Sequence, residues 1–213
     1  MFSNLQQTLA ISITAPIIPE QINEKLADKV GKEIFKGDNI QQILGSNSFL
    51  QTTSHDKQIE CIIEPNKIQC STSFAGKVTS ETFTLLTTHI TKILDVFMIS
   101  PNSMPIAITL TCLPDYEHAM ETLKALFDSS IFQFPNIKGG GIRLFTHSST
   151  PDILANEIFI EPFLRDDNRA YVQGSFKYAQ VPLETLHTTC SNDIESYYTM
   201  LSYLARLRSN GGM

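Results

Sequence analysis

The five histidines of this 213-residue chain are the side chains best suited to acid–base or metal chemistry. None of them lies in an HxH, HExxH or zinc-type Cys/His pattern, so the sequence predicts no metal site. His55 and His147 are of interest together, because they occupy equivalent positions in an internal repeat. With Arg143, they define a candidate pocket between the repeats for a small molecule or an enzyme reaction. The simpler interpretation is that both histidines are solvated where a strand meets a loop.

Glu64 and Glu161 form a second equivalent pair, each inside an Ile-Glu-Pro triplet. Two carboxylates that face one site can act as a general acid and a general base. The proline explains the pattern more simply, because it ends or turns a strand and leaves the glutamate at a solvated rim. We therefore predict no catalytic residue.

The glycine run at 139–141 lies beside Lys138 and Arg143, a composition typical of phosphate-binding loops. Such a loop needs a preceding strand and a following helix whose N-terminus faces the anion. Here a helix is predicted before the run and a strand after it. The glycines are therefore interpreted as a tight entry into that strand, and no cofactor is predicted.

The four cysteines show no CxxC pairing, and three of them lie in strand-like patterns, which favours free buried thiols over disulfides: Cys61, Cys70, Cys112 and Cys190. No stretch approaches the roughly 20 apolar residues of a membrane span, and the first residues lack the pattern of a signal peptide. The sequence therefore predicts a cytoplasmic protein without membrane association.

The charge balance is acidic, with 16 Lys and Arg against 22 Asp and Glu and a net charge of −6. Nucleic-acid binding usually requires a cationic surface, because counterion release from phosphates supplies much of the affinity. We therefore expect no nucleic-acid partner. All the arginines lie in the second half of the chain.

An internal repeat organises these residues. Leu9–Thr14 recurs as Ile106–Thr111, 97 positions later, and at the same offset Ile63-Glu64-Pro65 matches Ile160-Glu161-Pro162. The sequence thus predicts a tandem duplication with units at 1–100 and 101–213. The short linker at Ser100–Pro105 favours one joint globular unit.

Each unit is predicted to contain, in order, a strand, a helix, three strands and a helix. The predicted strands alternate apolar and polar residues, and the predicted helices carry apolar residues at helical spacing. In the first unit these are strand 9–14, a helix opened by Pro19-Glu20, strands 49–53, 59–63 and 68–74, and a helix from Thr79 or Ser80 to Phe97. In the second unit they are strand 106–112, helix 115–127, strands 142–147, 157–163 and 169–177, and helix 192–208. We expect an α+β fold with helices packed on one face of one or two antiparallel sheets.

The opposite face of those strands is predicted to carry short polar side chains and no Lys or Arg. The simpler interpretation is a sheet face that is only exposed to solvent. The functional interpretation is a recognition surface, because hydroxyl and amide groups bind a partner without desolvating charge. The predicted surface consists of Ser12, Thr14, Gln69, Ser71, Ser73, Thr109, Thr111, Tyr171, Gln173 and Ser175.

The duplicated unit resembles in topology the saddle of the TATA-binding protein. That family grips the DNA minor groove with basic and apolar wedge residues on the underside of its sheet. The polar face predicted here has neither, so DNA binding is not carried over.

The last eight residues resemble the tail of ubiquitin-like precursors, which end in Gly-Gly and are trimmed before conjugation. Gly211 and Gly212 would be the conjugation residues. The chain departs from that pattern at Ser209-Asn210 and in the helix predicted before the tail.

These observations favour a non-enzymatic protein-binding or assembly protein that uses the polar face or exposed edge strands, with self-association as one form of that function. The alternatives are a small-molecule-binding protein or enzyme with a pocket between the repeats, and a ubiquitin-like modifier precursor. The sequence identifies no reaction.

Overall fold

The computed structural model describes residues 5–46, 48–101, 104–115, 119, 123, 140–148 and 153–210, with side chains up to residue 204 in the last segment. The strands of this part are β1 Gln6–Thr14, β2 Ile40–Gly45, β3 Phe49–Ser54, β4 Ile59–Glu64, β5 Lys67–Ala75, β6 Met104–Cys112, β7 Ile142–Phe145, β8 Ile153–Pro162 and β9 Ala170–Val181. Its α-helices are α1 Glu24–Lys29, α2 Ser80–Val96 and α4 Leu186–Asn210.

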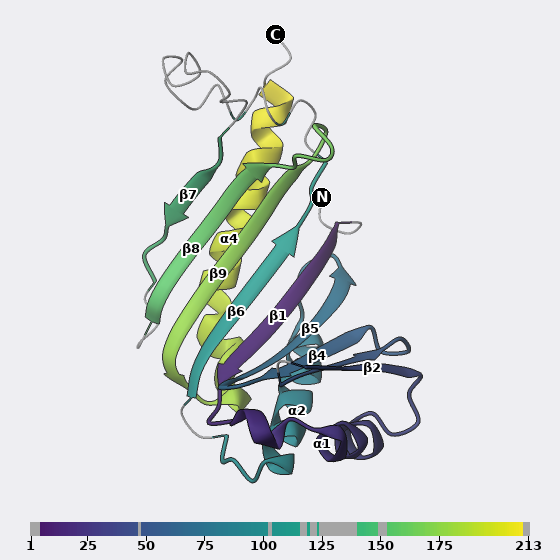
Figure 1. Ribbon diagram of the computed structural model, residues 1–213. Coiled ribbons are helices and arrows are strands. Elements are labelled where there is room, and N and C mark those ends of the chain that lie inside the picture. Colours follow the sequence, from purple (N-terminus) through teal and green to yellow (C-terminus); the bar gives the residue numbers. More distant parts are fainter. Residues whose placement is uncertain are drawn as a thin grey trace.

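All nine strands form one antiparallel sheet in the order β2-β3-β4-β5-β1-β6-β9-β8-β7. Three helices, α1, α2 and α4, pack on one side of this sheet (Figure 1). The predicted α+β architecture, with an antiparallel sheet and helices on one face, is therefore confirmed. Among the described helices, none has the length and apolar character needed to cross a membrane.

On both sides of the central β1–β6 pair, the neighbouring strands follow one another outward in reverse chain order. Strands β5, β4 and β3 follow β1 on one side, and β9, β8 and β7 follow β6 on the other. In the β1–β6 register Ile11 lies opposite Ile108, its own equivalent at the 97-position offset. The duplication itself stays a prediction, but the arrangement is the one that two paired copies would produce.

The hydrophobic core lies between the sheet and the helices. Along β1, Leu9, Ile11 and Ile13 are buried, and the intervening residues face the other way. Helix α2 begins where the Thr79 side chain accepts a hydrogen bond from the Thr82 amide, at 3.3 Å. Its apolar stripe, including Phe83, then closes over β5.

Helix α4 packs closely on β9 at a glycine. A Cβ atom at Gly174 would lie 2.8 Å from Cδ2 of Tyr197 and 2.9 Å from Cζ of Phe176, distances that side chains essentially never adopt. Asp193 of the same helix accepts hydrogen bonds from Tyr178 of β9, at 2.8 Å, and from Asn156 of β8, at 2.7 Å. The missing side chain at Gly174 and the buried carboxylate of Asp193 thus hold α4 against the sheet.

Three predicted elements differ in detail. The helix opened by Pro19-Glu20 is broken into a 3-10 turn Pro19–Gln21, helix α1 and a π-helical turn Val30–Ile34. No strand is predicted from the sequence at Ile40–Gly45, where β2 lies, so the first half contains one strand more than predicted. Of the helix predicted at 115–127, most lies outside the described residues, while Ala119 and Leu123 are helical and fully buried.

Candidate binding face

The ten residues of the predicted polar surface all lie on the sheet face opposite the helices. The pairing registers place them together: Thr109 lies opposite Ser175, and Thr111 lies opposite Gln173. We call this surface the polar face. It spans the four central strands β5, β1, β6 and β9, so it is built from both halves of the chain.

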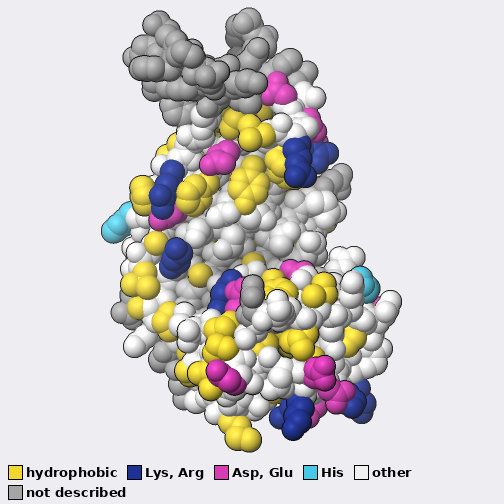
Figure 2. Space-filling model, in the orientation of Figure 1, with side chains coloured by type: hydrophobic (Ala, Val, Ile, Leu, Met, Phe, Trp, Pro, Cys, Tyr) yellow, Lys and Arg dark blue, Asp and Glu magenta, His cyan; other side chains and the backbone are white. Residues whose placement is uncertain are grey.

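Most of this surface is only half exposed. Of the ten residues, Thr14 and Ser73 are exposed, Ser175 is buried, and the others are intermediate. Figure 2 shows uncharged polar side chains and backbone in the middle of the face, with charged side chains toward its margins. Half-buried hydroxyls keep their hydrogen-bonding capacity while their methyl and methylene groups are covered.

The face as a whole is not free of basic residues, contrary to the sequence prediction. Lys67 lies opposite Thr14 and Lys177 lies opposite Ala107, which places both on this side of the sheet. The alternation of side chains continues into β4, β7 and β8, where the ion pair of Arg143 with Glu157 has an N–O distance of 2.6 Å. Charged residues of both signs therefore flank the polar face, and Lys177 also lies within it, in the same row of the sheet as Ser12.

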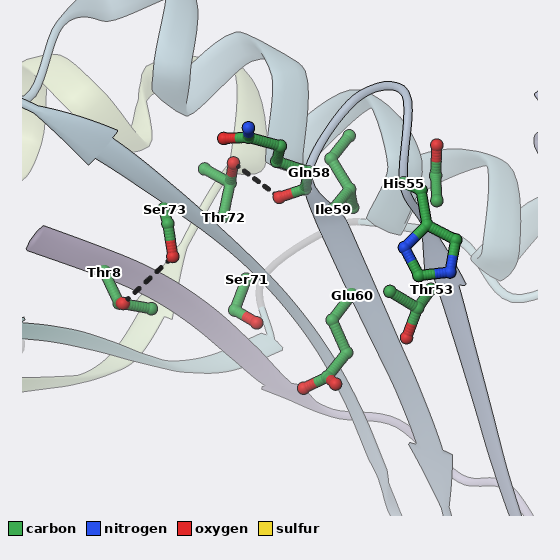
Figure 3. A pocket seen from close by; sticks show the side chains of 10 residues that line it. Thr8, Thr53, His55, Gln58, Ile59, Glu60, Ser71, Thr72 and Ser73 are labelled. Atoms are coloured by element: carbon green, nitrogen blue, oxygen red, sulfur yellow. Dashed lines mark hydrogen bonds between the residues drawn. The ribbon is translucent and has the colours of Figure 1, made fainter. Parts of the chain in front are cut away.

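A hollow of about 490 Å³ opens on this face over β1, β5, β4 and β3 (Figure 3). Glu60 lies at its centre, opposite Ser71 on one side and Thr53 on the other. The Gln51 amide donates a hydrogen bond of 2.5 Å to the Glu60 carboxylate. The lining consists of Thr8, Thr53, Ser54, His55, Gln58, Ile59, Glu60, Ser71, Thr72 and Ser73.

A second hollow of about 360 Å³ lies over the ends of β1, β6 and β9 and also has Thr8 and Ser73 in its wall. The hydroxyls of these two residues lie 3.4 Å apart and form a hydrogen bond (Figure 3), so this pair belongs to the walls of both hollows. We call the two hollows together the polar groove. The second is lined by Gln6, Gln7, Thr8, Ser73, Thr111, Cys112, Leu113, Phe163, Arg169 and Tyr171.

The two ends of the polar groove differ in charge. At the second hollow the Arg169 guanidinium lies 3.4 Å from the Asp166 carboxylate, and the Tyr171 hydroxyl donates a 2.6 Å hydrogen bond to Gln173. Burial, with a smaller contribution from Glu161, raises the pKa of Tyr171, so its hydroxyl stays protonated at neutral pH. The first hollow instead carries His55 and Glu60. Between these ends the groove offers mainly hydroxyl groups.

The structure does not bring together the three residues of the predicted pocket between the repeats. His55 follows β3, whereas Arg143 lies in β7, and six strands separate these two in the sheet. His147 is exposed after the end of β7. The Arg143 guanidinium lies 5.0 Å from the ring centroids of both Phe145 and Phe159. Of the three, only His55 lines a hollow of the polar groove.

Glu64 and Glu161 are likewise far apart, because four strands separate β4 from β8. Glu64 forms an ion pair with Lys67, at 3.3 Å. Gly141 precedes β7 and lies so close to Glu161 that a Cβ atom would collide with its side chain. This contact supports the interpretation of the glycines as a tight strand entry at the one position it tests.

All four cysteines are free and buried, as the sequence predicts. No group of three or more His, Cys, Asp or Glu side chains in the described residues could hold a metal ion. Helix α4 continues to Asn210, while Gly211 and Gly212 lie outside the described residues.

Sequence reasoning missed the neighbours of His55. It paired this residue with its repeat equivalent, whereas in the structure His55 lines one hollow together with Gln58 and Glu60. Strand alternation contained part of the signal, because Thr53, Glu60 and Ser71 fall on one face once the order β3-β4-β5 is known. The turn that places His55 beside them had no comparable signal.

Comparison with known proteins gives no match: neither a protein-family model nor a curated protein sequence matches this chain.

Proposed function

We propose that this chain is a non-enzymatic protein-binding or assembly protein and that the polar face is its recognition surface. The observation that carries the proposal is the polar groove, which crosses this face and is lined mainly by neutral hydrogen-bonding groups. The described helices all pack on the other side of the sheet.

The chemistry of the groove suits a polypeptide partner. Hydroxyl groups both donate and accept hydrogen bonds, so Thr8, Ser71 and Thr111 can match the alternating amides and carbonyls of an extended backbone. Their burial under a partner would desolvate no charge. The charged residues of this side of the sheet, Lys67, Lys177 and the Arg143–Glu157 pair, would help to select the partner.

Several titratable groups of the groove already form hydrogen bonds or ion pairs with neighbouring residues. Glu60 accepts a hydrogen bond from Gln51, and Arg169 pairs with Asp166. Groups held in this way serve as fixed polar contacts. This arrangement supports recognition over acid–base catalysis.

A matched pair of serine substitutions tests the proposal. Ser73 is exposed in the polar groove, and Ser191 is exposed on α4, on the opposite side of the sheet. We expect Ser73→Lys to weaken the affinity for a partner captured from the native host by at least about tenfold, because an unpaired charge would be buried at the interface. Ser191→Lys adds the same charge outside the interface and should leave the affinity unchanged.

The binding assay should use purified partner and isothermal titration, with thermal unfolding curves to show that each variant is folded. A fourfold variant with lysine at Thr14, Ser71, Thr111 and Gln173 should abolish binding. Equal affinities of the Ser73→Lys variant and the unsubstituted protein would refute the polar face as the recognition surface.

A second candidate function is the binding of a small polar molecule in the first hollow, favoured by the presence of His55, Gln58 and Glu60 among its lining residues. His55→Ala distinguishes the two functions. It should remove binding of a small molecule held by the hollow, whereas a protein partner spread over the whole groove should lose only part of its affinity.

A further inference from the structure

Cys61 of β4 and Cys70 of β5 lie directly opposite each other in the sheet. Their Sγ atoms are 2.6 Å apart, and the two side chains are 1% and 0% exposed. Directly opposite residues of an antiparallel pair have Cβ atoms about 4.5–5.5 Å apart, close to the roughly 3.5–4.5 Å of a disulfide. The two thiols therefore need little backbone movement to become bonded.

We propose that Cys61 and Cys70 are a modification site, at which an oxidised low-molecular-weight disulfide converts the two thiols into a reversible intramolecular disulfide. One cysteine loses its proton, and its thiolate attacks a sulfur of the reagent, which releases one reagent thiolate and leaves a mixed disulfide. The second cysteine then loses its proton and attacks the protein sulfur of that mixed disulfide, releasing the second reagent thiolate. The protein loses two electrons and two protons, and the reagent is reduced to two thiols.

The other two cysteines are engaged with different groups. The Tyr197 hydroxyl donates to the Cys112 sulfur at 3.1 Å, and the Cys190 thiol donates to the His187 carbonyl at 3.5 Å. Burial raises the pKa of Cys112 to about 11 and that of Cys190 to about 12, so both stay protonated at neutral pH. They provide internal controls in the same molecule.

Access to the pair requires the protein to open. Both sulfurs lie on the helix side of the sheet, where α2 packs against β5. Burial also raises the pKa of Cys70 well above its ordinary value, which lowers the thiolate fraction. Oxidation is therefore slow in the native state, and moderate urea accelerates it by populating the opened β4–β5 hairpin.

The site lies under the polar groove. Glu60 and Ser71, the sequence neighbours of the two cysteines, point to the opposite face and line the first hollow. A disulfide between β4 and β5 would thus fix the strands that carry one end of the groove.

The experiment uses the full chain with oxidised glutathione, at several urea concentrations below the unfolding midpoint, followed by peptide mapping without reduction. The expected product is lighter by about 2 Da, contains linked Cys61 and Cys70 peptides, and reverts with dithiothreitol. Of the four thiols, two remain titratable after oxidation. Because nine positions separate the cysteines, closing this loop should raise the melting temperature by about 5–10 °C.

Cys61→Ser and Cys70→Ser should each abolish the linked product, and Cys190→Ser should leave it unchanged. The mapping of the unsubstituted protein stands even if a serine variant fails to fold. Four titratable thiols after oxidation in urea, a product limited to mixed disulfides with glutathione, or linkage to Cys112 or Cys190 would each overturn the proposal.

Discussion

The hydrogen bond from Tyr178 to Asp193 offers a sharp test of how α4 is held on the sheet. The tyrosine is fully buried, the carboxylate is 2% exposed, and the O–O distance is 2.8 Å. The other carboxylate oxygen of Asp193 accepts from Asn156. Tyr178→Phe removes a single hydroxyl group, keeps the ring in place, and leaves the buried carboxylate with one donor fewer.

A hydrogen bond to a charged group contributes about 1.5–3 kcal/mol to the free energy of unfolding, and losing it leaves part of a buried charge unsolvated. For a chain of this length the loss corresponds to a decrease of about 3–12 °C in the melting temperature. Burial, followed by the contribution of Asp193, raises the pKa of Tyr178 far above its ordinary value. The hydroxyl therefore stays protonated, and remains a donor, at neutral pH.

Tyr197→Phe is the matched control. This tyrosine is also fully buried, but its hydroxyl donates to the sulfur of Cys112 at 3.1 Å. A thiol sulfur is a weak acceptor, so we expect a loss below about 1 kcal/mol. Urea unfolding of both variants, with the slope m compared to confirm a two-state transition, measures the difference.

A double-mutant cycle with Asp193→Asn isolates the charge. An asparagine offers one acceptor oxygen for the two donors, so Tyr178→Phe should cost less in that background by about 1 kcal/mol or more. The reasoning would be refuted if Tyr197→Phe destabilised the protein as much as Tyr178→Phe, or if the cycle showed no coupling.

Two further predictions concern pH and close packing. Burial lowers the pKa of the His89 imidazole, so protonation favours the unfolded state, and the free energy of unfolding should fall as the pH drops below about 6.5. His89→Gln should show a flatter profile between pH 5 and 8 in denaturant titrations, and identical profiles would contradict this assignment. Gly174→Ala should destabilise the protein by about 1–3 kcal/mol in thermal unfolding, because the added Cβ atom collides with Tyr197 and Phe176. An unchanged melting temperature would show that α4 does not approach β9 this closely.

Strand periodicity explains why much of the sheet was predictable from sequence. From Leu9 to Thr14 and from Ile106 to Thr111 large apolar residues alternate with small ones, and the structure buries every predicted core position from Leu9 to Ile13. Strand β2 was not predicted, because its apolar and polar residues do not alternate. Ile43 and Leu44 are neighbours on opposite faces of this edge strand, and both are exposed. An edge strand buries too little surface to impose a pattern on its sequence.

The candidate site was less predictable, because its residues meet only through strand order. Alternation assigned the ten polar residues to one face, since this property is local. Which strands are neighbours is a long-range property, so the partners of His55 could not be obtained from the repeat alignment. The predicted repeat pairs His55 with His147, but positions that match between the two halves lie far apart in the sheet unless they are near the central β1–β6 pair.

The same geometry explains why residues of the two halves meet at the centre of the sheet and not at its ends. Thr8 and Ser73 come from the first half, and Thr111 and Tyr171 come from the second, yet all four line the same hollow across the β1–β6 pair. Residues of the outer strands, such as Glu60 of β4 and Arg143 of β7, each lie on the side of their own half. The second hollow therefore depends on the pairing of β1 with β6, and neither half alone would present it, whereas the first hollow is lined by residues of the first half.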